Sequence, residues 1–450
     1  MQGIPPKNTA KFSLPGEILL VFHFLQCILP YITFFTFYQR NTQMVNVKEF
    51  GAKGDGCTDD TAAIQAALDT NEVVSFPAGI YNSNTIYLRS GGGLHLEEGA
   101  VLRALADKTK CNPDDYPPPN RVFASEHVSG AHFIIAYECE NITLSGKGTI
   151  DGNYKAVFDT GNVVGLDSAH PHYEFPQWRM AQMIFICNCR NIEVRDIRLE
   201  NAQYWNCFFH GCENIHVDNV SIWGDPLVMN TDGIDIDCCR HVLIENCHIE
   251  TGDDCVTARG NELALGRHAP CEDVEVRNCY FVSVTCGIRV GVGQGEIRNC
   301  RFHHIEMHKT CIGIGICPSY RSGNCCMIEK CTFEDITFDG LQPLLLIPCW
   351  MGVTDTDDPA IRPVRDLAFR RFKAQGRRPV QCLGPNASGI FENIVFEDFS
   401  VKLVEPVLRP VPHRWTKEEF GVFNIANFPD LDISGITAES EGAYPPFCRL

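Results

Sequence analysis

Apolar and polar residues alternate in short runs along the middle of the chain, and these runs recur. Most copies begin at Asn, Asp or His and are bounded by Gly, Asn or Asp, which is typical of short strands. Successive copies start 23 to 32 residues apart. The copies lie at 191–194, 214–217, 241–244, 273–276, 296–299 and 327–330, with a late copy at 393–396.

No single copy can bury its apolar face alone, so neighbouring copies must stack on one another. The irregular spacing indicates loops of variable length on an otherwise regular coil. We therefore predict an all-β chain folded as a right-handed parallel β-helix. A leucine-rich repeat would carry a Leu and Asn signature that is missing here, and a β-propeller would need a longer period and antiparallel blades.

The pattern also predicts what lies at the ends of the coil. The segment 62–68 is predicted to be a helix, with Thr58 as its N-cap, that covers the open end of the first turn. The segments 108–121 and 343–363 are predicted loops. Residues 45–450 are expected to form one β-helix domain, with a less periodic tail from about 401 that folds back along the outside.

The first 43 residues differ from the rest, because 14–38 is rich in Leu, Ile and Phe. This stretch is either a membrane anchor or an extension upstream of a true start at Met44. A start at Met44 implies a cytoplasmic protein. The anchor implies a membrane-bound or exported one, and it is the only expected membrane contact.

The composition of the chain limits which classes of ligand and cofactor it is expected to bind. The formal net charge of −18 argues against nucleic acid as a ligand. The 24 cysteines show no paired C-x2-C spacing, so neither a metal nor a cofactor is expected. Several cysteines are predicted to occupy equivalent places in the repeats and to stack as small apolar groups in a reduced chain. These are Cys239, Cys247, Cys279, Cys300 and Cys331.

Three carboxylates are the candidate catalytic groups. Asp232 and the pair Asp253-Asp254 lie about one repeat apart, so stacking can bring them to one surface. Glycoside hydrolysis needs such a set, with one protonated acid and one ionised carboxylate, and crowding of like charges raises one pKa. Asp residues in coil turns also cap backbone groups, which is the role we expect for Asp235 and Asp237.

Four motifs give the chain a family resemblance: FGAKGDG at 50–56, GKGTIDG at 146–152, NTDG at 230–233 and GDD at 252–254. With them the chain resembles the polygalacturonase-like glycoside hydrolases of family 28, which have the pectin-lyase-like β-helix fold. The resemblance implies an inverting hydrolase of pectic chains. It also implies that Asp253 is the general acid and that Asp232 and Asp254 activate water.

Two segments depart from that family. The family usually has a Gly-His-Gly segment where this chain has residues 284–291, which contain no His. It also has an Arg-Ile-Lys segment that binds uronate, where this chain has residues 312–316 without either cation. The candidate substrate-binding residues are Asn230, Arg259, His268 and Arg289. Arg289 is the best placed of them, because an Arg can bind a carboxylate through two parallel hydrogen bonds.

Two other functions stay open. One is a calcium-dependent polysaccharide lyase of the same fold, with the three carboxylates as ligands. The other is a glycan-binding β-helix without catalysis. For an inverting hydrolase, we expect the acid and base carboxyls to lie about 6.5–9.5 Å apart, which leaves room for water.

Overall fold

The computed structural model describes residues 44–119, 126–166, 170–321, 324–350, 361–385, 390–405, 421–428, 431–442 and 444–449. The apolar extension 1–43 and the questions of anchor, start and compartment therefore fall outside the described residues. Among the described residues, no helix has the length and apolar character needed to cross a bilayer.

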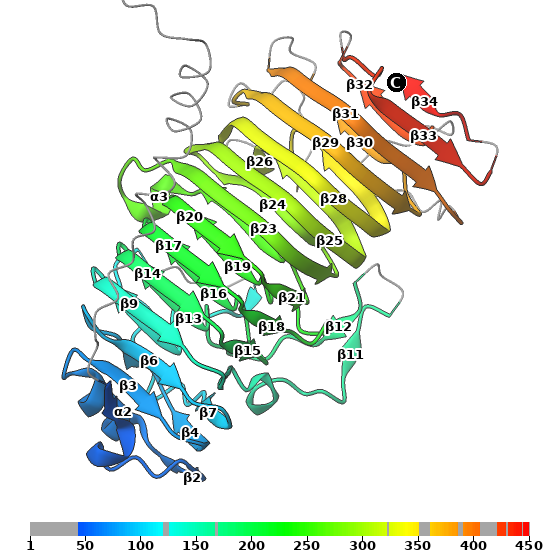
Figure 1. Cartoon of the computed structure of the whole chain (residues 1–450). Helices are drawn as coiled ribbons and strands as arrows, with labels where there is room; N and C mark the ends of the chain where they lie inside the picture. The colour runs from blue at the N-terminus through cyan, green and yellow to red at the C-terminus, as the bar shows by residue number, and fades with distance from the viewer. Residues whose placement is uncertain are drawn as a thin grey trace, which may run out of the picture. The chain divides into compact units, whose positions relative to one another are not determined.

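Parallel strands stacked in successive coils form one large sheet system, with colour running from blue to red along the stack (Figure 1). The fold class predicted from the repeats is confirmed. In each central coil, three strands follow one another. One coil has β13 (Ile184–Cys187), β14 (Arg190–Arg195) and β15 (Arg198–Glu200), and the next has β16 (Cys207–His210), β17 (Glu213–Asp218) and β18 (Ser221–Trp223).

The following coils keep this order and lengthen. They contain β19 (Ile234–Asp237), β20 (Arg240–Glu245) and β21 (His248–Thr251), then β22 (Val256–Gly260) and β23 (Cys271–Ser283), then β24 (Cys286–Gly293) and β25 (Glu296–Cys317). Later strands are β28 (Met327–Leu346), β29 (Val364–Gly376), β30 (Val380–Leu383) and β31 (Phe391–Leu403). The first residues of the predicted loop 343–363 belong to β28.

The end of the chain continues the stack. β32 (Phe423–Ala426), β33 (Ile436–Ser440) and β34 (Phe447–Arg449) pair in parallel with the strands of the preceding coils. The expectation that the tail folds back along the outside is therefore wrong for these strands.

The Asn, Asp or His residue that begins most repeats lies at the corner between two strands. Asn191, Asn214, His241 and Asp273 all have left-handed backbone conformations, with φ between 54° and 59°. Asn and Asp adopt this conformation at lower cost than other non-glycine residues. Asn214 also donates a side-chain hydrogen bond to Asn191, so the corners are stabilised from coil to coil.

A short helix covers the first coil, as predicted. Helix α2 (Thr61–Leu68) buries Ile64, Ala67 and Leu68 in the main core. Its N-cap residue is Asp60 rather than Thr58. Thr58 instead donates its hydroxyl to Asp55, and Asp59 accepts a hydrogen bond from the backbone of Thr61. The cap prediction failed because several turn residues compete for the same few backbone donors.

These cysteines stack in two rows rather than one. In the first row, backbone-to-sulfur hydrogen bonds join Cys189, Cys212 and Cys239, and Cys271 continues the row to Cys300 and Cys331. Cys247 lies beside Cys279 in the second row. The repeat sequences alone did not fix these rows, because the loops between strands vary in length.

Stacked phenylalanines fill the later coils. Phe333 lies 5.2 Å from Phe302 and Phe369 lies 5.0 Å from Phe333, measured between ring centroids, with nearly parallel planes. Replacing Phe369 with Ala is expected to lower the free energy of unfolding by about 3–5 kcal/mol, because the cavity removes contacts on both sides. Urea denaturation of this variant and of a Phe369→Leu control measures it. A loss below about 1 kcal/mol for Phe369→Ala would contradict the stacking argument.

Candidate active site

One face of the coil forms a groove, and its floor is built by β13, β16, β19, β22 and β24. Residues in register along this floor follow one another as Phe185, Phe208, Asp235, Thr257 and Arg289. Side chains at such positions point to the same face of a sheet. The floor therefore changes from aromatic to charged in the direction of the C-terminus.

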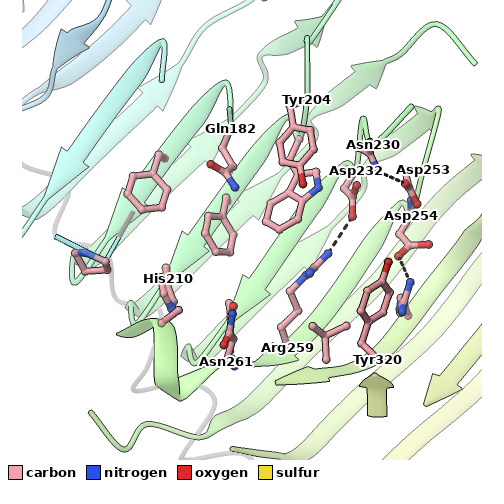
Figure 2. Close-up of a pocket in the computed structure, with 18 of the residues that line it drawn as sticks. Gln182, Tyr204, His210, Asn230, Asp232, Asp253, Asp254, Arg259, Asn261 and Tyr320 are labelled. Carbon is pink, nitrogen blue, oxygen red and sulfur yellow. Dashed lines mark hydrogen bonds and ion pairs between the residues drawn. The ribbon is translucent and has the colours of Figure 1, made fainter. Parts of the chain in front are cut away.

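A cavity of about 420 Å³ lies over this floor (Figure 2). Its aromatic side contains Tyr204, Trp205 and Phe208, with the amide of Gln182 beside them. The three candidate carboxylates line its other side, together with Arg259, Arg289 and Tyr320. Pro119 and Glu126 also line the cavity, and Glu126 accepts a hydrogen bond from the hydroxyl of Tyr204.

The three carboxylates converge because they precede neighbouring strands. Asp232 lies just before β19, and Asp253 and Asp254 lie just before β22 on the next coil. One oxygen from each of the three lies within 4.8 Å of the others. Adjacent strands lie about 4.7–4.9 Å apart, which allows this convergence. Asp232 and Asp254 are buried, and Asp253 is partly exposed.

The hydrogen bonds of Asp253 place its proton on one oxygen. Oδ1 accepts from the hydroxyl of Thr285 at 2.7 Å and from the backbone of Asp254 at 3.0 Å. Oδ2 has only a longer bond, in which the amide of Asn230 donates at 3.3 Å. An oxygen that already accepts two hydrogen bonds is a poor place for a proton, so we assign the proton to Oδ2.

Burial, followed by the negative charge of Asp254, raises the pKa of Asp253 to about 7. A carboxyl that acts as a general acid must hold its proton, so its contribution is present below this pKa and is lost above it. We therefore expect kcat/KM to fall as the pH rises through about 7. A profile of kcat/KM between about pH 5 and about pH 9 measures this, and a flat profile would remove Asp253 from the acid role.

The other two carboxylates each contact an arginine. Oδ2 of Asp232 accepts from Arg259 Nη2 at 3.1 Å, and Arg259 also donates to Asp235 at 2.7 Å. Oδ2 of Asp254 accepts from Arg289 Nη1 at 3.3 Å. Burial and the charges of the neighbouring carboxylates hold the pKa of Asp232 well above its usual range. Asp235 is thus a buried partner of Arg259, and not the turn cap that we expected.

The spacing of the carboxyls differs from the expectation for an inverting enzyme. The nearest oxygens lie within 4.8 Å, whereas inverting pairs are usually about 6.5–9.5 Å apart. Side chains that leave consecutive coils in parallel are separated by about one strand spacing, and a larger separation would require them to diverge. Two carboxylate oxygens this close can still share one hydrogen-bonded water.

Two family models and several relatives match this chain. Residues 120–265 match the model for glycosyl hydrolases of family 28, and residues 44–91 match that for rhamnogalacturonase A/epimerase, pectate lyase-like proteins. A polygalacturonase of Arabidopsis thaliana is 24% identical over 350 residues, which cover 68% of this chain and 75% of that protein. Polygalacturonase-2 of Solanum lycopersicum is 25% identical, over 64% of this chain and 65% of its own. Residues 120–265 of the chain are thus similar to glycosyl hydrolase family 28.

Solved structures show the same fold. The exopolygalacturonase of Thermotoga maritima has a TM-score of 0.65 at 21% identity, covering 81% of this chain and 89% of its own. The family 28 exopolygalacturonase of Yersinia enterocolitica has a TM-score of 0.68 at 18% identity, covering 91% of this chain and 77% of its own. The resemblance drawn from the four motifs is therefore confirmed.

The structure brings most of the predicted site residues together. Asn230, Arg259 and Arg289 line the cavity beside the three carboxylates. His268 is not among the described residues that line it. The His268 side chain is 68% exposed, and its ring pairs with Glu262. Its assignment from the sequence relied on closeness along the chain to Arg259, and the short helix α3 (Glu262–Leu265) separates the two.

One functional residue was not predicted from the sequence. Arg179 is fully buried and donates to the backbone oxygens of Gln203 and Met229 and to Oδ1 of Asn230. It therefore fixes the orientation of the amide that contacts Asp253. Burial lowers the pKa of Arg179 to about 10, which leaves it charged at neutral pH. A lone Arg in a polar segment gave no signal for this role.

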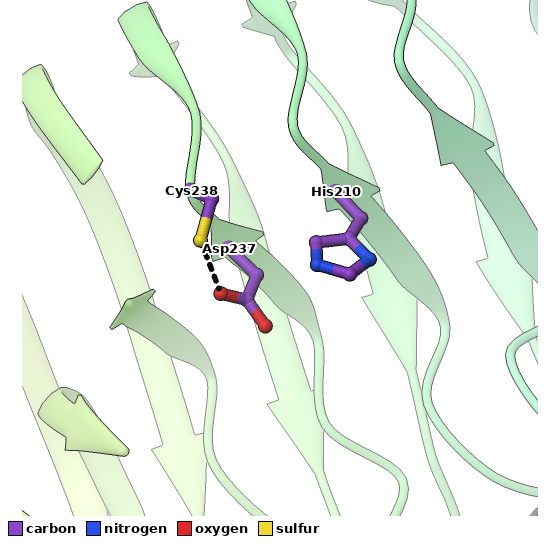
Figure 3. Close-up of side chains that lie close together, drawn as sticks. All are labelled: His210, Asp237 and Cys238. Carbon is purple, nitrogen blue, oxygen red and sulfur yellow. Dashed lines mark hydrogen bonds between the residues drawn. The ribbon is translucent and has the colours of Figure 1, made fainter. Parts of the chain in front are cut away.

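A second group of potential metal ligands lies further along the groove floor. His210, Asp237 and Cys238 come from neighbouring coils and each offers a ligand atom within 4.8 Å of the others (Figure 3). The thiol of Cys238 donates to Asp237 Oδ1 at 3.3 Å, and the backbone of Asn261 donates to the same oxygen at 2.7 Å. Burial and the nearby Asp237 raise the pKa of this thiol, so it is a protonated donor.

Proposed function

We propose that this chain hydrolyses a glycosidic bond in a pectic or related plant polysaccharide or oligosaccharide. The observation that carries the proposal is the group of three carboxylates in the cavity, where burial raises the pKa of Asp253 to about 7. A carboxyl that keeps its proton near neutral pH, next to carboxylates that can be ionised, is what glycoside hydrolysis needs.

In the proposed mechanism, Asp253 Oδ2 gives its proton to the glycosidic oxygen as the bond from that oxygen to the sugar carbon breaks. Water attacks the sugar carbon, and its proton passes to Asp232 or Asp254. Among the described residues, Asp232 Oδ1 has no hydrogen bond from the protein, whereas both oxygens of Asp254 have one. Burial and the neighbouring negative charges hold the pKa of Asp232 well above its usual range, whereas Asp254 is paired with Arg289, so we assign the base to Asp254, with Asp232 Oδ1 holding the water.

The arginines argue against a calcium-dependent lyase. A calcium ion needs six to eight oxygen ligands, about three of which the carboxylates would supply. Arg259 and Arg289 each occupy an oxygen of these carboxylates, and a fixed positive charge at this distance repels a divalent cation. A binding protein without catalysis would have no need of a proton held near neutral pH on a groove carboxyl.

Incubation with a panel of pectic and neutral glycans tests the proposal. We expect release of reducing ends that is insensitive to EDTA. Products with an unsaturated sugar, detected by ultraviolet absorption, would instead establish a lyase, and binding without any product would establish a glycan-binding protein. Proton NMR early in the reaction gives the stereochemistry, for which we propose inversion despite the short carboxyl spacing. Retention would make Asp232 or Asp254 a nucleophile.

A further inference from the structure

A histidine, an aspartate and a cysteine meet where β16 and β19 end. His210 is paired in register with Asp237, so the two side chains leave the same face of the sheet. Cys238 follows directly, and each of the three offers a ligand atom within 4.8 Å of the others (Figure 3). Figure 2 shows His210 on the other side of the cavity from Asp253. The three residues therefore form a group separate from the catalytic carboxylates.

The backbone turns the thiol toward the aspartate. Consecutive residues of a strand point to opposite faces, which would hold Cys238 and Asp237 apart. Cys238 lies just past the end of β19, however, and its φ of 55° is in the left-handed region. Its Sγ consequently lies 3.3 Å from Oδ1 of Asp237. Two donor atoms from adjacent residues thus face the imidazole of the neighbouring coil.

The carboxylate of this group lacks a cation. Asp237 is only 2% exposed, and within the described part of the chain no lysine or arginine forms an ion pair with it. Arg259 is in register with Asp237 on the neighbouring coil, but it pairs with Asp232 and Asp235 instead. A buried carboxylate without a paired charge is costly, and a bound cation would compensate for that cost.

The surroundings suit an enclosed ion. Cys238 packs against Leu265 of α3 and against Ala269, and the His210 ring stacks on Phe208 with 5.3 Å between the ring centres. Apolar neighbours of this kind keep water from competing for the ligands. His210 and Asp237 also line the cavity, which gives an ion a path to the group.

The chemistry of the three donors selects zinc. Imidazole nitrogen, carboxylate oxygen and thiolate sulfur all bind zinc, at about 2.0–2.3 Å, whereas calcium and magnesium prefer oxygen ligands. Ligand atoms on one tetrahedral zinc ion lie about 3.3–3.6 Å apart, a separation that Cys238 Sγ and Asp237 Oδ1 already have. The backbone of Asn261 donates to the same Oδ1 and holds the carboxylate in place, as a second layer of contacts does in metal sites.

We infer that His210, Asp237 and Cys238 bind one zinc ion. The thiol proton of Cys238 passes to solvent when the ion binds, so one thiolate and one carboxylate balance the two positive charges. The fourth position faces the cavity and is filled by water. The ion joins two coils beside α3, and its removal is expected to leave hydrolysis in place because no catalytic carboxylate is a ligand. The ligands come from different coils, so no local spacing of residues in the sequence predicted them.

Metal analysis and titration test the inference. The full chain, purified without a chelator, is expected to contain about one zinc ion. The apo chain, titrated with zinc alone, should bind it with a Kd below about 1 µM. Cobalt(II) in place of zinc should give the near-ultraviolet absorption of a thiolate-to-cobalt charge transfer, which reports directly on a bound cysteine.

Three variants locate the site. Cys238→Ser is expected to abolish the cobalt–thiolate absorption and to weaken zinc binding by at least about 100-fold, because a ligand is lost. His210→Gln should weaken zinc binding to a similar extent and retain the absorption at higher cobalt concentration, since the thiolate remains. Cys57→Ser is the matched control, because Cys57 is an exposed thiol, and it should change neither. Circular dichroism establishes that each variant is folded.

A chain that contains no zinc, and whose apo form binds it more weakly than about 1 µM, would overturn the inference. Cobalt–thiolate absorption that survives in Cys238→Ser would do the same, because it would assign the thiolate to another of the 24 cysteines. If Cys238→Ser does not fold, His210→Gln decides, and unchanged zinc affinity in that variant refutes the site. None of these readouts depends on turnover, so the proposed hydrolysis and the zinc site can fail separately.

Discussion

Asp253→Asn is expected to lower kcat by about three orders of magnitude, because an amide cannot donate the proton that the leaving oxygen needs. The amide can still accept the hydrogen bonds from Thr285 and from the backbone of Asp254, so the fold is retained. Initial rates on the best pectic substrate, with circular dichroism of both proteins, measure the effect. Near-normal turnover would exclude Asp253 as the acid.

The same variant makes a prediction about stability. The pKa of Asp253 in the folded chain, about 7, lies above the ordinary value of 3.8, so ionisation is disfavoured by folding. The wild type should therefore lose stability as the pH rises from about 4 through about 7, whereas Asp253→Asn lacks this contribution. Above that range the variant should be at least as stable as the wild type. Asp218→Asn, on the outer strand β17, is a control that should change neither kcat nor this pH dependence.

Arg179→Met is expected to have the second large effect. The change leaves the oxygens of Gln203, Met229 and Asn230 without their donor, each at a cost of about 1–3 kcal/mol. We expect the free energy of unfolding, measured by urea denaturation, to fall by at least about 3 kcal/mol. Arg240→Met is the control, because its exposed pair with Glu213 contributes less than about 1 kcal/mol.

Arg179 also acts through Asn230 on the acid. Without the guanidinium, the Asn230 amide can rotate, and Asp253 Oδ2 loses a fixed donor that favours its ionised form. The high-pH limb of the kcat/KM profile should then move to higher pH, and kcat should fall by about 10-fold or more. A purely structural role would lower stability and leave the limb in place. Comparison at a temperature where the variant is fully folded separates these outcomes.

The sequence by itself determined the fold and the position of the carboxylates. Alternating apolar residues force each repeat to be a strand, and the residues at the corners, such as Asn191 and Asn214, tolerate the left-handed turn that repeats in every coil. Both are local properties, so one repeat predicts the next. The motifs around Asp232 and Asp253 lie one coil apart, and parallel stacking alone brings them to one edge.

The tertiary structure decided which partners these groups have. The pairing of Arg259 with Asp232 and Asp235, the pairing of Arg289 with Asp254 and the burial of Arg179 under Asn230 all depend on register between coils. The loops between strands differ in length, and the length of a loop in the sequence does not show which residues of adjacent coils it brings into register. For the same reason His268, close to Arg259 in the chain, lies on the surface, whereas Arg179, 74 positions before Asp253, fixes the neighbour of the acid.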